Sequence, residues 1–373
     1  MKSGGASGII LGHIVMTLGC HTLLLAATGQ VWAFGWNKSG QLGLGHTLPQ
    51  SSPTLVPWDG PQPMQLDWGH SHSVILDEEG GVWVAGLSGY ETEDSTTFQR
   101  VTELPPIAQV SSGFQHTSAC DFDGRLWTWG VVQQGTDTLS LTGAVHPLEG
   151  LPPILKFACG ENFLMAESID EELWVLGDNS RGQLGIGPNQ KDFCSPRTVE
   201  VQGTRPKGLL RCLAACQFSL TLVDSEGGVW TAGNTSYGEL GRKGPCDVFQ
   251  KVNLPSVEEI SCGGDHILAL DENGNPWGWG LGGYGQLGDG TDQNKPEPTA
   301  LSSLGDPGMS LLAGYNHSLA FLADGSISIF GYGGNGELGL GNTEHQNTPQ
   351  PLSITASPPR PSTSSRSKNP FFT

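Results

Sequence analysis

Val82-Trp83-Val84-Ala85-Gly86 is a short apolar strand that ends in glycine, and the chain contains seven copies of it. The copies end at glycines 51, 44, 47, 56, 47 and 51 residues apart, namely Gly35, Gly86, Gly130, Gly177, Gly233, Gly280 and Gly331. Six copies carry tryptophan in the second position: Trp32, Trp83, Trp127, Trp174, Trp230 and Trp277. Self-similarity with a period of about fifty residues is the signature of a repeat architecture. We expect these tryptophans to be buried between the repeats.

A second strand precedes each copy at a fixed distance. Eleven residues before the tryptophan slot stand His21, His72, His116, His266 and His317, with Phe163 in the fourth copy and Phe218, one residue further away, in the fifth. The two strands are joined by turns such as Asp123-Gly124 and Asp324-Gly325. Asp-Gly and Asn-Gly pairs supply the positive φ angles of tight antiparallel hairpins.

Two further strands complete each copy. An apolar run such as Val257–Cys262 precedes the histidine, and a proline-bearing segment, for example around Pro298, comes last. Proline cannot donate a ladder hydrogen bond, so it suits an outermost edge strand. Four short strands in each of seven copies predict an all-β fold, a seven-bladed β-propeller of four-stranded blades. The propeller spans 9–356, after a short N-terminal lead (1–8) and before a Pro/Ser-rich tail (357–373) that we expect to be disordered.

A Gly-Gln/Glu-Leu-Gly element follows the strand glycine in five copies, as at Gly40–Gly43 and Gly285–Gly288. The second and third copies instead continue as Leu87–Tyr90 and Val131–Gly135. Sequence drift and a contact private to this sector explain the departure equally well.

Gly-x-x-His-Ser, Asp-Gly-x-Val-Trp-x-x-Gly and Gly-Gln-Leu-Gly-x-Gly together resemble the repeat of the regulator of chromosome condensation family. The resemblance covers about residues 9 to 354, and copies three to seven also resemble its subgroup of the secretion-regulating exchange factor and the fungal α-tubulin suppressor. It implies two functions, a protein-binding propeller or a guanine-nucleotide exchange factor for a small GTPase of the Ran type. A plant ultraviolet photoreceptor of the same fold uses Gly-Trp-Arg-His-Thr units, and none of them occurs here.

Charge narrows the choice of partner. The chain has 37 acidic and 18 basic residues and a formal net charge of −19. The tail contains Arg360, Arg366 and Lys368 and no acidic residue, so the rest of the chain, its body, has a net charge of −22. Such a body repels phosphate backbones and anionic lipid, so we expect a protein partner, a small GTPase or a basic protein, and neither nucleic acid nor membrane. The eight cysteines lack zinc spacing, so we expect free thiols, no metal and no cofactor.

The N-terminal run Ile9–Leu25 has the apolar character of a signal peptide. His13, Gly19 and His21 interrupt it, however, and it stays in register with the repeats. We therefore expect it to form strands of the propeller in a cytoplasmic monomer, with the nucleus as an alternative location.

Alternating strand direction sorts the loops onto two rims. One rim collects the Asp/Glu-Gly hairpins and thirteen of the acids: Asp77, Glu78, Glu79, Asp121, Asp123, Asp170, Glu171, Glu172, Asp224, Glu226, Asp271, Glu272 and Asp324. Much of this is turn chemistry, but a ring of like charge also suits a basic partner. The other rim holds the Gly-x-x-His connectors and aromatic and arginine residues of the types that anchor protein interfaces. On that rim we select as partner-binding candidates Trp36, Phe114, Tyr237, Arg242, Tyr284 and Tyr315, and the family resemblance adds Asp265, His266 and His317.

Catalysis of bond chemistry is not favoured. A histidine that recurs once per copy is typical of a fold element, and the chain has no phosphate-binding loop and no nucleophile–base pattern. Exchange activity would need a projecting wedge, for which Val199–Leu210 is the one candidate. The favoured function is therefore an adaptor or regulatory scaffold, with nucleotide exchange as the alternative.

Overall fold

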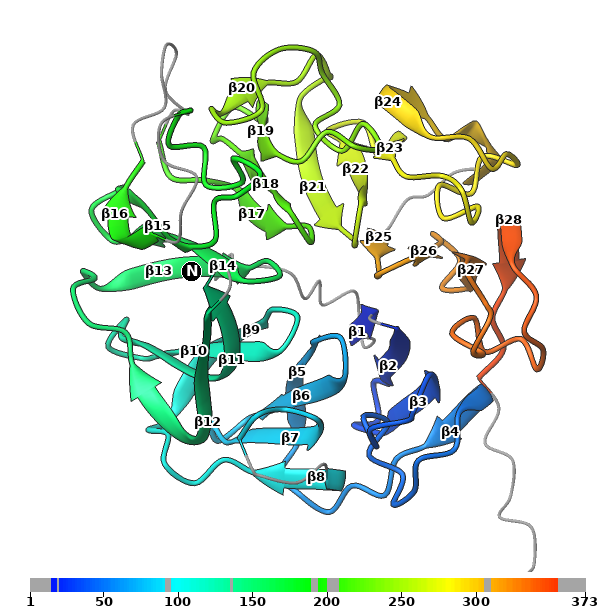
Figure 1. The fold of residues 1–373 in the computed structure, drawn as a ribbon. Helices are drawn as coiled ribbons and strands as arrows, with labels where there is room; N and C mark the ends of the chain where they lie inside the picture. Colours follow the sequence, from blue (N-terminus) through cyan, green and yellow to red (C-terminus); the bar gives the residue numbers. More distant parts are fainter. Residues whose placement is uncertain are drawn as a thin grey trace, which may run out of the picture.

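The structure, a computed structural model, describes residues 15–18, 20–90, 95–134, 137–188, 194–199, 208–304 and 310–354. Within them the chain forms seven four-stranded antiparallel sheets arranged in a ring (Figure 1), which confirms the predicted seven-bladed β-propeller. The N-terminal lead and the tail lie outside the described residues.

Each blade is a consecutive stretch of chain, and its strands pair in chain order. Blade one consists of β1 (Val15–Leu18), β2 (His21–Leu25), β3 (Val31–Gly35) and β4 (Gln50–Leu55), and blade two of β5 (Pro63–Trp68), β6 (His72–Asp77), β7 (Val82–Gly86) and β8 (Ser95–Arg100). Blade three consists of β9 (Ile107–Ser112), β10 (His116–Asp121), β11 (Leu126–Gln134) and β12 (Asp137–Pro147). Blade four consists of β13 (Ile154–Cys159), β14 (Phe163–Ser168), β15 (Leu173–Gly177) and β16 (Cys194–Thr198). Blade five consists of β17 (Cys212–Ala215), β18 (Ser219–Val223), β19 (Val229–Gly233) and β20 (Gln250–Lys251). Blade six consists of β21 (Val257–Cys262), β22 (His266–Asp271), β23 (Pro276–Gly280) and β24 (Lys295–Ala300), and the 3₁₀ turn η1 (Ser302–Leu304) follows it. Blade seven consists of β25 (Ser310–Ala313), β26 (His317–Phe321), β27 (Ile327–Gly331) and β28 (Gln346–Pro351).

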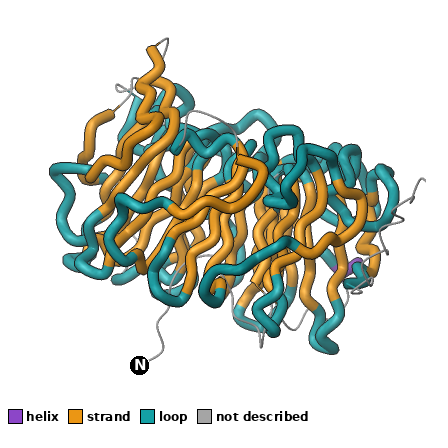
Figure 2. The backbone as a smooth tube through the Cα atoms, turned by 90° about the horizontal axis from the view of Figure 1, so that it is seen from below, coloured by secondary structure: helices purple, strands orange, loops and turns teal. Residues whose placement is uncertain are grey.

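The first strand of each blade lies innermost and the fourth outermost (Figure 1). Each inner strand contacts the inner strand of the next blade, and β25 of the last blade contacts β1 of the first. The ring therefore closes between complete blades. Seen from the side, the strands run between two rims of loops (Figure 2).

The histidine at the start of the second strand joins its blade to the next one. His21 Nε2 lies 2.6 Å from Ser73 Oγ, which in turn donates a 2.7 Å hydrogen bond to the carbonyl oxygen of Gln41. Because the hydroxyl proton is used on that carbonyl, the histidine must be the donor at Nε2. Two more blade pairs contain the same relay, His266–Ser318–Gln286 and His317–Thr22–Glu337, and His72 bonds Thr117 at 2.8 Å.

This relay explains two features of the repeat. The glycine three residues before the histidine is required because a Cβ at Gly69, Gly113 or Gly263 would overlap the imidazole ring. The imidazole is neutral because burial, reinforced by neighbouring histidines, lowers the pKa of His21, His72 and His266 to about 3. The recurring histidines are thus fold elements, as the sequence indicated.

Blades four and five replace this relay with apolar packing. Phe163 starts β14 and Leu164 follows it, so His116 of the third blade meets no hydroxyl there. In the fifth blade the register pairs Ser219 with Gly233, as His21 pairs with Gly35. The histidine slot of that copy is therefore Ser219, and the expectation of Phe218 was wrong by one residue. Phe163 packs in one cluster with residues such as Leu220 and Phe249 of blade five.

The expectation of six buried tryptophans is wrong for four of them. Trp32 and Trp230 are buried, whereas Trp83, Trp127, Trp174 and Trp277 are half-buried. The slot lies next to the hairpin end of the strand, so the indole edge reaches the rim. There it donates to the hairpin carboxylate, as Trp83 Nε1 does to Asp77 Oδ2 at 2.8 Å.

Side chains of the inner strands cap the backbone of the neighbouring inner strand. Gln65 Nε2 donates to the carbonyl of Val110 at 2.9 Å, and its Oε1 accepts from the Val110 amide at 3.2 Å. Gln109 bonds the Phe157 carbonyl in the same way. Glu259 Oε1 accepts from the Leu311 amide of the last blade at 3.3 Å and from the neighbouring Ser310 Oγ at 2.5 Å. Buried strand edges need such partners, because an unpaired backbone group costs about 1–3 kcal/mol.

The relay predicts that acid lowers the stability of the folded chain, and the substitution His72→Gln isolates this effect. Gln at position 72 can still donate to Thr117 but does not titrate. At about pH 7.5 we expect His72→Gln to be the less stable chain. Below about pH 6.5 the unfolded wild type binds a proton at His72 that the folded state, with a pKa of about 3, does not, so the wild type loses stability relative to the variant.

Urea midpoints of the two chains between about pH 7.5 and about pH 5 measure this difference. Below pH 6.5 the difference in free energy of unfolding between the wild type and His72→Gln should shrink by up to about 1.4 kcal/mol per pH unit. Parallel pH profiles would show that His72 titrates in the folded state and that the neutral relay is wrong.

Candidate partner-binding rim

The rim that carries the Gly-x-x-His connectors also carries the loops from the third to the fourth strand of each blade, as predicted, because the strands alternate in direction. We call it the connector rim and the opposite one the hairpin rim (Figure 2). Backbone hydrogen bonds link the connectors from blade to blade: His70 N to Phe114 O, Phe114 N to Glu161 O, Glu161 N to Gln217 O, Gln217 N to Gly264 O and Gly264 N to Tyr315 O, at 2.9–3.1 Å. The first residue after the connector glycine is therefore held in a ring around the central axis.

Four aromatic side chains gather on one half of this ring. His70 stacks on Phe114 with ring centroids 4.2 Å apart and meets Trp36 edge-on at 5.3 Å. Tyr315 of the last blade meets the same imidazole edge-on at 6.0 Å. All four side chains are half-buried, so one face of the group is packed and the other is open to solvent. We call Trp36, His70, Phe114 and Tyr315 the aromatic cluster.

Tyr315 connects this cluster to the other half of the ring. Its hydroxyl lies 3.3 Å from Gln217 Oε1, and Gln217 Nε2 donates to Glu161 Oε2 at 2.6 Å. Tyr315 therefore contacts blade two on one side and blade five on the other, and its side chain lies across the axis. Burial and the nearby Cys20, Asp265 and Glu161 raise the pKa of this phenol to about 12, so it stays a hydrogen-bond donor.

Carboxylates dominate the half of the ring beyond Tyr315. Burial and the neighbouring Glu239 raise the pKa of Asp265 to about 7, and burial also raises the pKa of Glu161. The nearby cation is Arg181, whose guanidinium lies 4.4 Å above the Phe218 ring and lowers both pKa values. The acids are therefore under-neutralised, which makes this half of the ring receptive to a positive charge.

The remaining candidates lie apart from this ring. Tyr284 is exposed and packs with Tyr332 and His345, at centroid distances of 5.2 and 5.8 Å, and Tyr237 is also exposed. The guanidinium of Arg242 is used inside its own blade, where it donates to the carbonyl oxygens of Thr231, Pro245 and Val248. His266 and His317 are fully buried in the blade relay, out of reach of a partner.

Of the residues selected from the sequence, the structure brings Trp36, Phe114, Tyr315 and Asp265 to this part of the connector rim, and the selection missed His70, Glu161 and Gln217. A signal for the missed residues was present, because each stands directly after the residue at the connector-glycine position of its copy. The histidine pattern drew attention to the fourth residue of the connector, which the fold buries.

The ring presents half-buried aromatic side chains beside carboxylates and an amide. No group of three or more His, Cys, Asp or Glu that could hold a metal occurs in the part of the chain that the structure describes. Among the same residues no helix is long and apolar enough to cross a membrane. Aromatic faces beside carboxylates that have few positive charges near them can hold a partner's side chain that is cationic or has both an apolar and a cationic part.

Comparison with known proteins agrees with the repeat pattern. The family model of the RCC1-like domain matches residues 88–365, and that of the regulator of chromosome condensation (RCC1) repeat matches residues 28–76. The mouse regulator of chromosome condensation is 30% identical over 355 residues, which cover 85% of this chain and 83% of the relative. The ultraviolet-B receptor UVR8 of Arabidopsis thaliana is 27% identical, covering 88% and 79%.

A solved structure extends the match to the fold. Prp20p of Saccharomyces cerevisiae, studied for its binding to Gsp1p and histones, superposes with a TM-score of 0.77 at 20% identity, covering 92% of this chain and 88% of its own. At this identity the likeness concerns the architecture of the ring.

The raised pKa of Asp265 predicts how Asp265→Asn changes stability with pH. The folded wild type keeps a proton near neutral pH that the unfolded chain, with an ordinary pKa of 3.8, has released, so this group loses stabilising effect as pH rises toward 7. Asparagine does not titrate. We expect the melting temperature of the variant, relative to wild type, to rise between about pH 5 and about pH 8.

Differential scanning fluorimetry of both chains across this range measures the effect. A difference in melting temperature that does not change with pH would mean that Asp265 has an ordinary pKa and that the carboxylates of the ring are not crowded.

Proposed function

The chain belongs to the regulator of chromosome condensation repeat family, and on that premise we propose that it is a regulatory propeller that binds a protein partner at the connector rim. The observation that carries the proposal is the convergence of all seven blades on one small surface. From the first blade to the seventh they contribute Trp36, His70, Phe114, Glu161, Gln217, Asp265 and Tyr315.

The chemistry of this surface favours a partner that presents a basic side chain. The aromatic cluster offers ring faces to a cation, and an exposed cation–π contact contributes about 0.5–1 kcal/mol. Glu161 and Asp265 lie beyond Tyr315 and would be relieved by a positive charge, since burial makes their ionised forms costly. A chain with a net charge of −19 also steers a basic partner toward the ring.

Affinity enrichment from cells that express the protein tests the proposal. We expect His70→Ala/Tyr315→Ala to lose at least about tenfold of the partner recovered by the wild type, because both side chains are half-exposed and open the aromatic cluster when truncated. Arg242→Glu is not a suitable probe, because it would disrupt three hydrogen bonds of its own blade.

The matched control is Glu78→Gln, which removes an exposed charge on the hairpin rim of the second blade. It should recover the partner as the wild type does. Loss with Glu78→Gln and retention with the aromatic variant would move the site to the hairpin rim and contradict the proposal.

Nucleotide exchange on a Ran-type GTPase is the second candidate, and the likeness to Prp20p, which binds Gsp1p, favours it. The wedge candidate Val199–Leu210 weighs against it. Residues 200–207 lie outside the described residues, but Val199 and Leu210 at its ends are both buried in the core between blades four and five. A stretch of this length between two blades usually only crosses from one blade to the next.

We therefore expect no faster release of labelled GDP from Ran at about micromolar propeller than without it. Stopped-flow fluorescence with the mouse relative as positive control measures the rate. Acceleration of about a hundredfold or more, abolished by deletion of residues 204–208, would establish exchange activity instead.

A further inference from the structure

Three large apolar side chains are exposed together on the hairpin rim of blades three and four. Phe122 in the hairpin of blade three is 75% exposed, Ile169 in the hairpin of blade four 58%, and Leu155 at the start of β13 47%. Contiguous apolar surface of this kind on a soluble protein marks an interaction site more often than chance.

Backbone contacts hold these residues next to one another around Pro153, which is itself exposed. The amide of Ile169 donates to the Pro153 carbonyl at 3.1 Å, and Gly124, two residues after Phe122, accepts from the Ile154 amide at 2.8 Å. Leu155 is the extra residue of a β-bulge, because the register moves from Ile154↔Ser168 directly to Lys156↔Glu167. The bulge turns its side chain outward. We call Phe122, Pro153, Leu155 and Ile169 the apolar patch.

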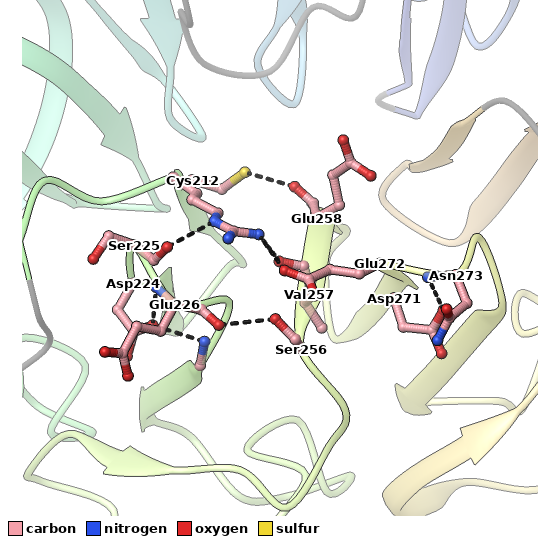
Figure 3. A network of polar contacts seen from close by, with 12 residues as sticks. Cys212, Asp224, Ser225, Glu226, Ser256, Val257, Glu258, Asp271, Glu272 and Asn273 are labelled. Atoms are coloured by element: carbon pink, nitrogen blue, oxygen red, sulfur yellow. Dashed lines mark hydrogen bonds and ion pairs between the residues drawn. The ribbon is translucent and has the colours of Figure 1, made fainter.

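The fold does not require apolar residues at these positions, as the sixth blade demonstrates. There the equivalents of Pro153, Leu155 and Ile169 are Ser256, Glu258 and Glu272. Figure 3 shows these polar residues between blades five and six: Glu272 pairs with Arg211 at 3.0 Å, and Ser256 Oγ donates to the Glu226 carbonyl at 2.8 Å. The same frame thus carries an ion pair in one sector and exposed hydrocarbon in another.

The surroundings of the apolar patch are acidic. Asp170, Glu171 and Glu172 follow Ile169 and are exposed. On the other hairpin, Asp123 has a side chain 76% exposed, and the nearest cation to it is Arg125, 4.0 Å away. A partner that covers the hydrocarbon therefore gains most if positive charges flank its apolar side chain.

We propose that the apolar patch is a second docking surface, which binds a segment of a partner protein that presents one large apolar side chain flanked by lysine or arginine. It lies on the rim opposite the aromatic cluster and does not rest on the function proposed for the connector rim. Failure of either proposal would leave the other standing.

Selection from a random peptide library on the full-length chain tests the proposal directly. We expect the enriched peptides to combine Phe, Trp or Leu with neighbouring Lys or Arg. As synthetic peptides they should bind Leu155→Glu/Ile169→Glu at least about tenfold more weakly than wild type by fluorescence anisotropy. The variant carries the glutamates that blade six has in these positions, so its melting temperature should match that of the wild type.

Two further variants sharpen the test. Asp170→Asn/Glu171→Gln keeps the hydrocarbon and should weaken the same peptides and reduce the salt dependence of binding. Leu48→Gln removes a side chain that is 67% exposed in blade one, away from the apolar patch, and should bind as the wild type does. Peptides that bind all variants equally, acidic peptides, or no enrichment at all would overturn the proposal.

Other occupants of the apolar patch are separate outcomes. A dimer of the wild type that Leu155→Glu/Ile169→Glu abolishes in sedimentation would make a second copy the occupant. Displacement of the selected peptides by a synthetic peptide of residues 357–373, which is basic and contains Phe371 and Phe372, would make the tail of the chain the occupant. Either result would contradict a partner segment.

Discussion

The fold depends on one constraint. A single stretch of chain joins each blade to the next, so side chains that reach into the next blade must hold the ring together. The histidine relay does this with one buried hydrogen bond from imidazole to hydroxyl and one from hydroxyl to carbonyl. Each partner then restricts another part of the repeat. The imidazole excludes a side chain from Gly69, and the carbonyl belongs to Gln41 in the Gly-Gln-Leu-Gly turn. Repeat signatures that look independent in the sequence are therefore parts of one contact.

Where the relay is absent, the ring is held by hydrocarbon and by inner-strand capping. Phe163 replaces the histidine in blade four and Ser219 in blade five, and their interface is filled by residues such as Met165 and Phe249. The buried Lys156 adds an ion pair with Glu167 at 3.4 Å and a hydrogen bond to the Leu210 carbonyl. In the same two blades Glu161 and Gln217 lie on the connector rim, and Leu155 and Ile169 lie on the hairpin rim.

The repeat was sufficient to predict the architecture and the division into rims, because both follow from periodicity and alternating strand direction. The repeat pattern did not predict how deeply each side chain is buried. Trp83 and Trp279 both look like core residues in sequence, but Trp83 bonds the hairpin carboxylate at the rim while Trp279 is fully enclosed. The contact of Tyr315 with His70 was also beyond the sequence, because it joins blade seven to blade two past blade one. Two residues separate β1 from β2 there, one fewer than the three between β5 and β6.

A closed ring of this kind also decides how two surfaces on opposite rims can act together. The strands run from rim to rim and every inner strand contacts the inner strand of the next blade, so the aromatic cluster and the apolar patch are held on opposite rims of one ring. As long as the packed ring keeps this one arrangement, neither surface changes shape when the other is occupied. Partners held on the two rims would therefore be coupled by proximity, through raised effective concentration, rather than by a conformational change. With both proposed surfaces occupied, the chain would act as a scaffold, and that behaviour would arise from the same side-chain contacts that close the ring.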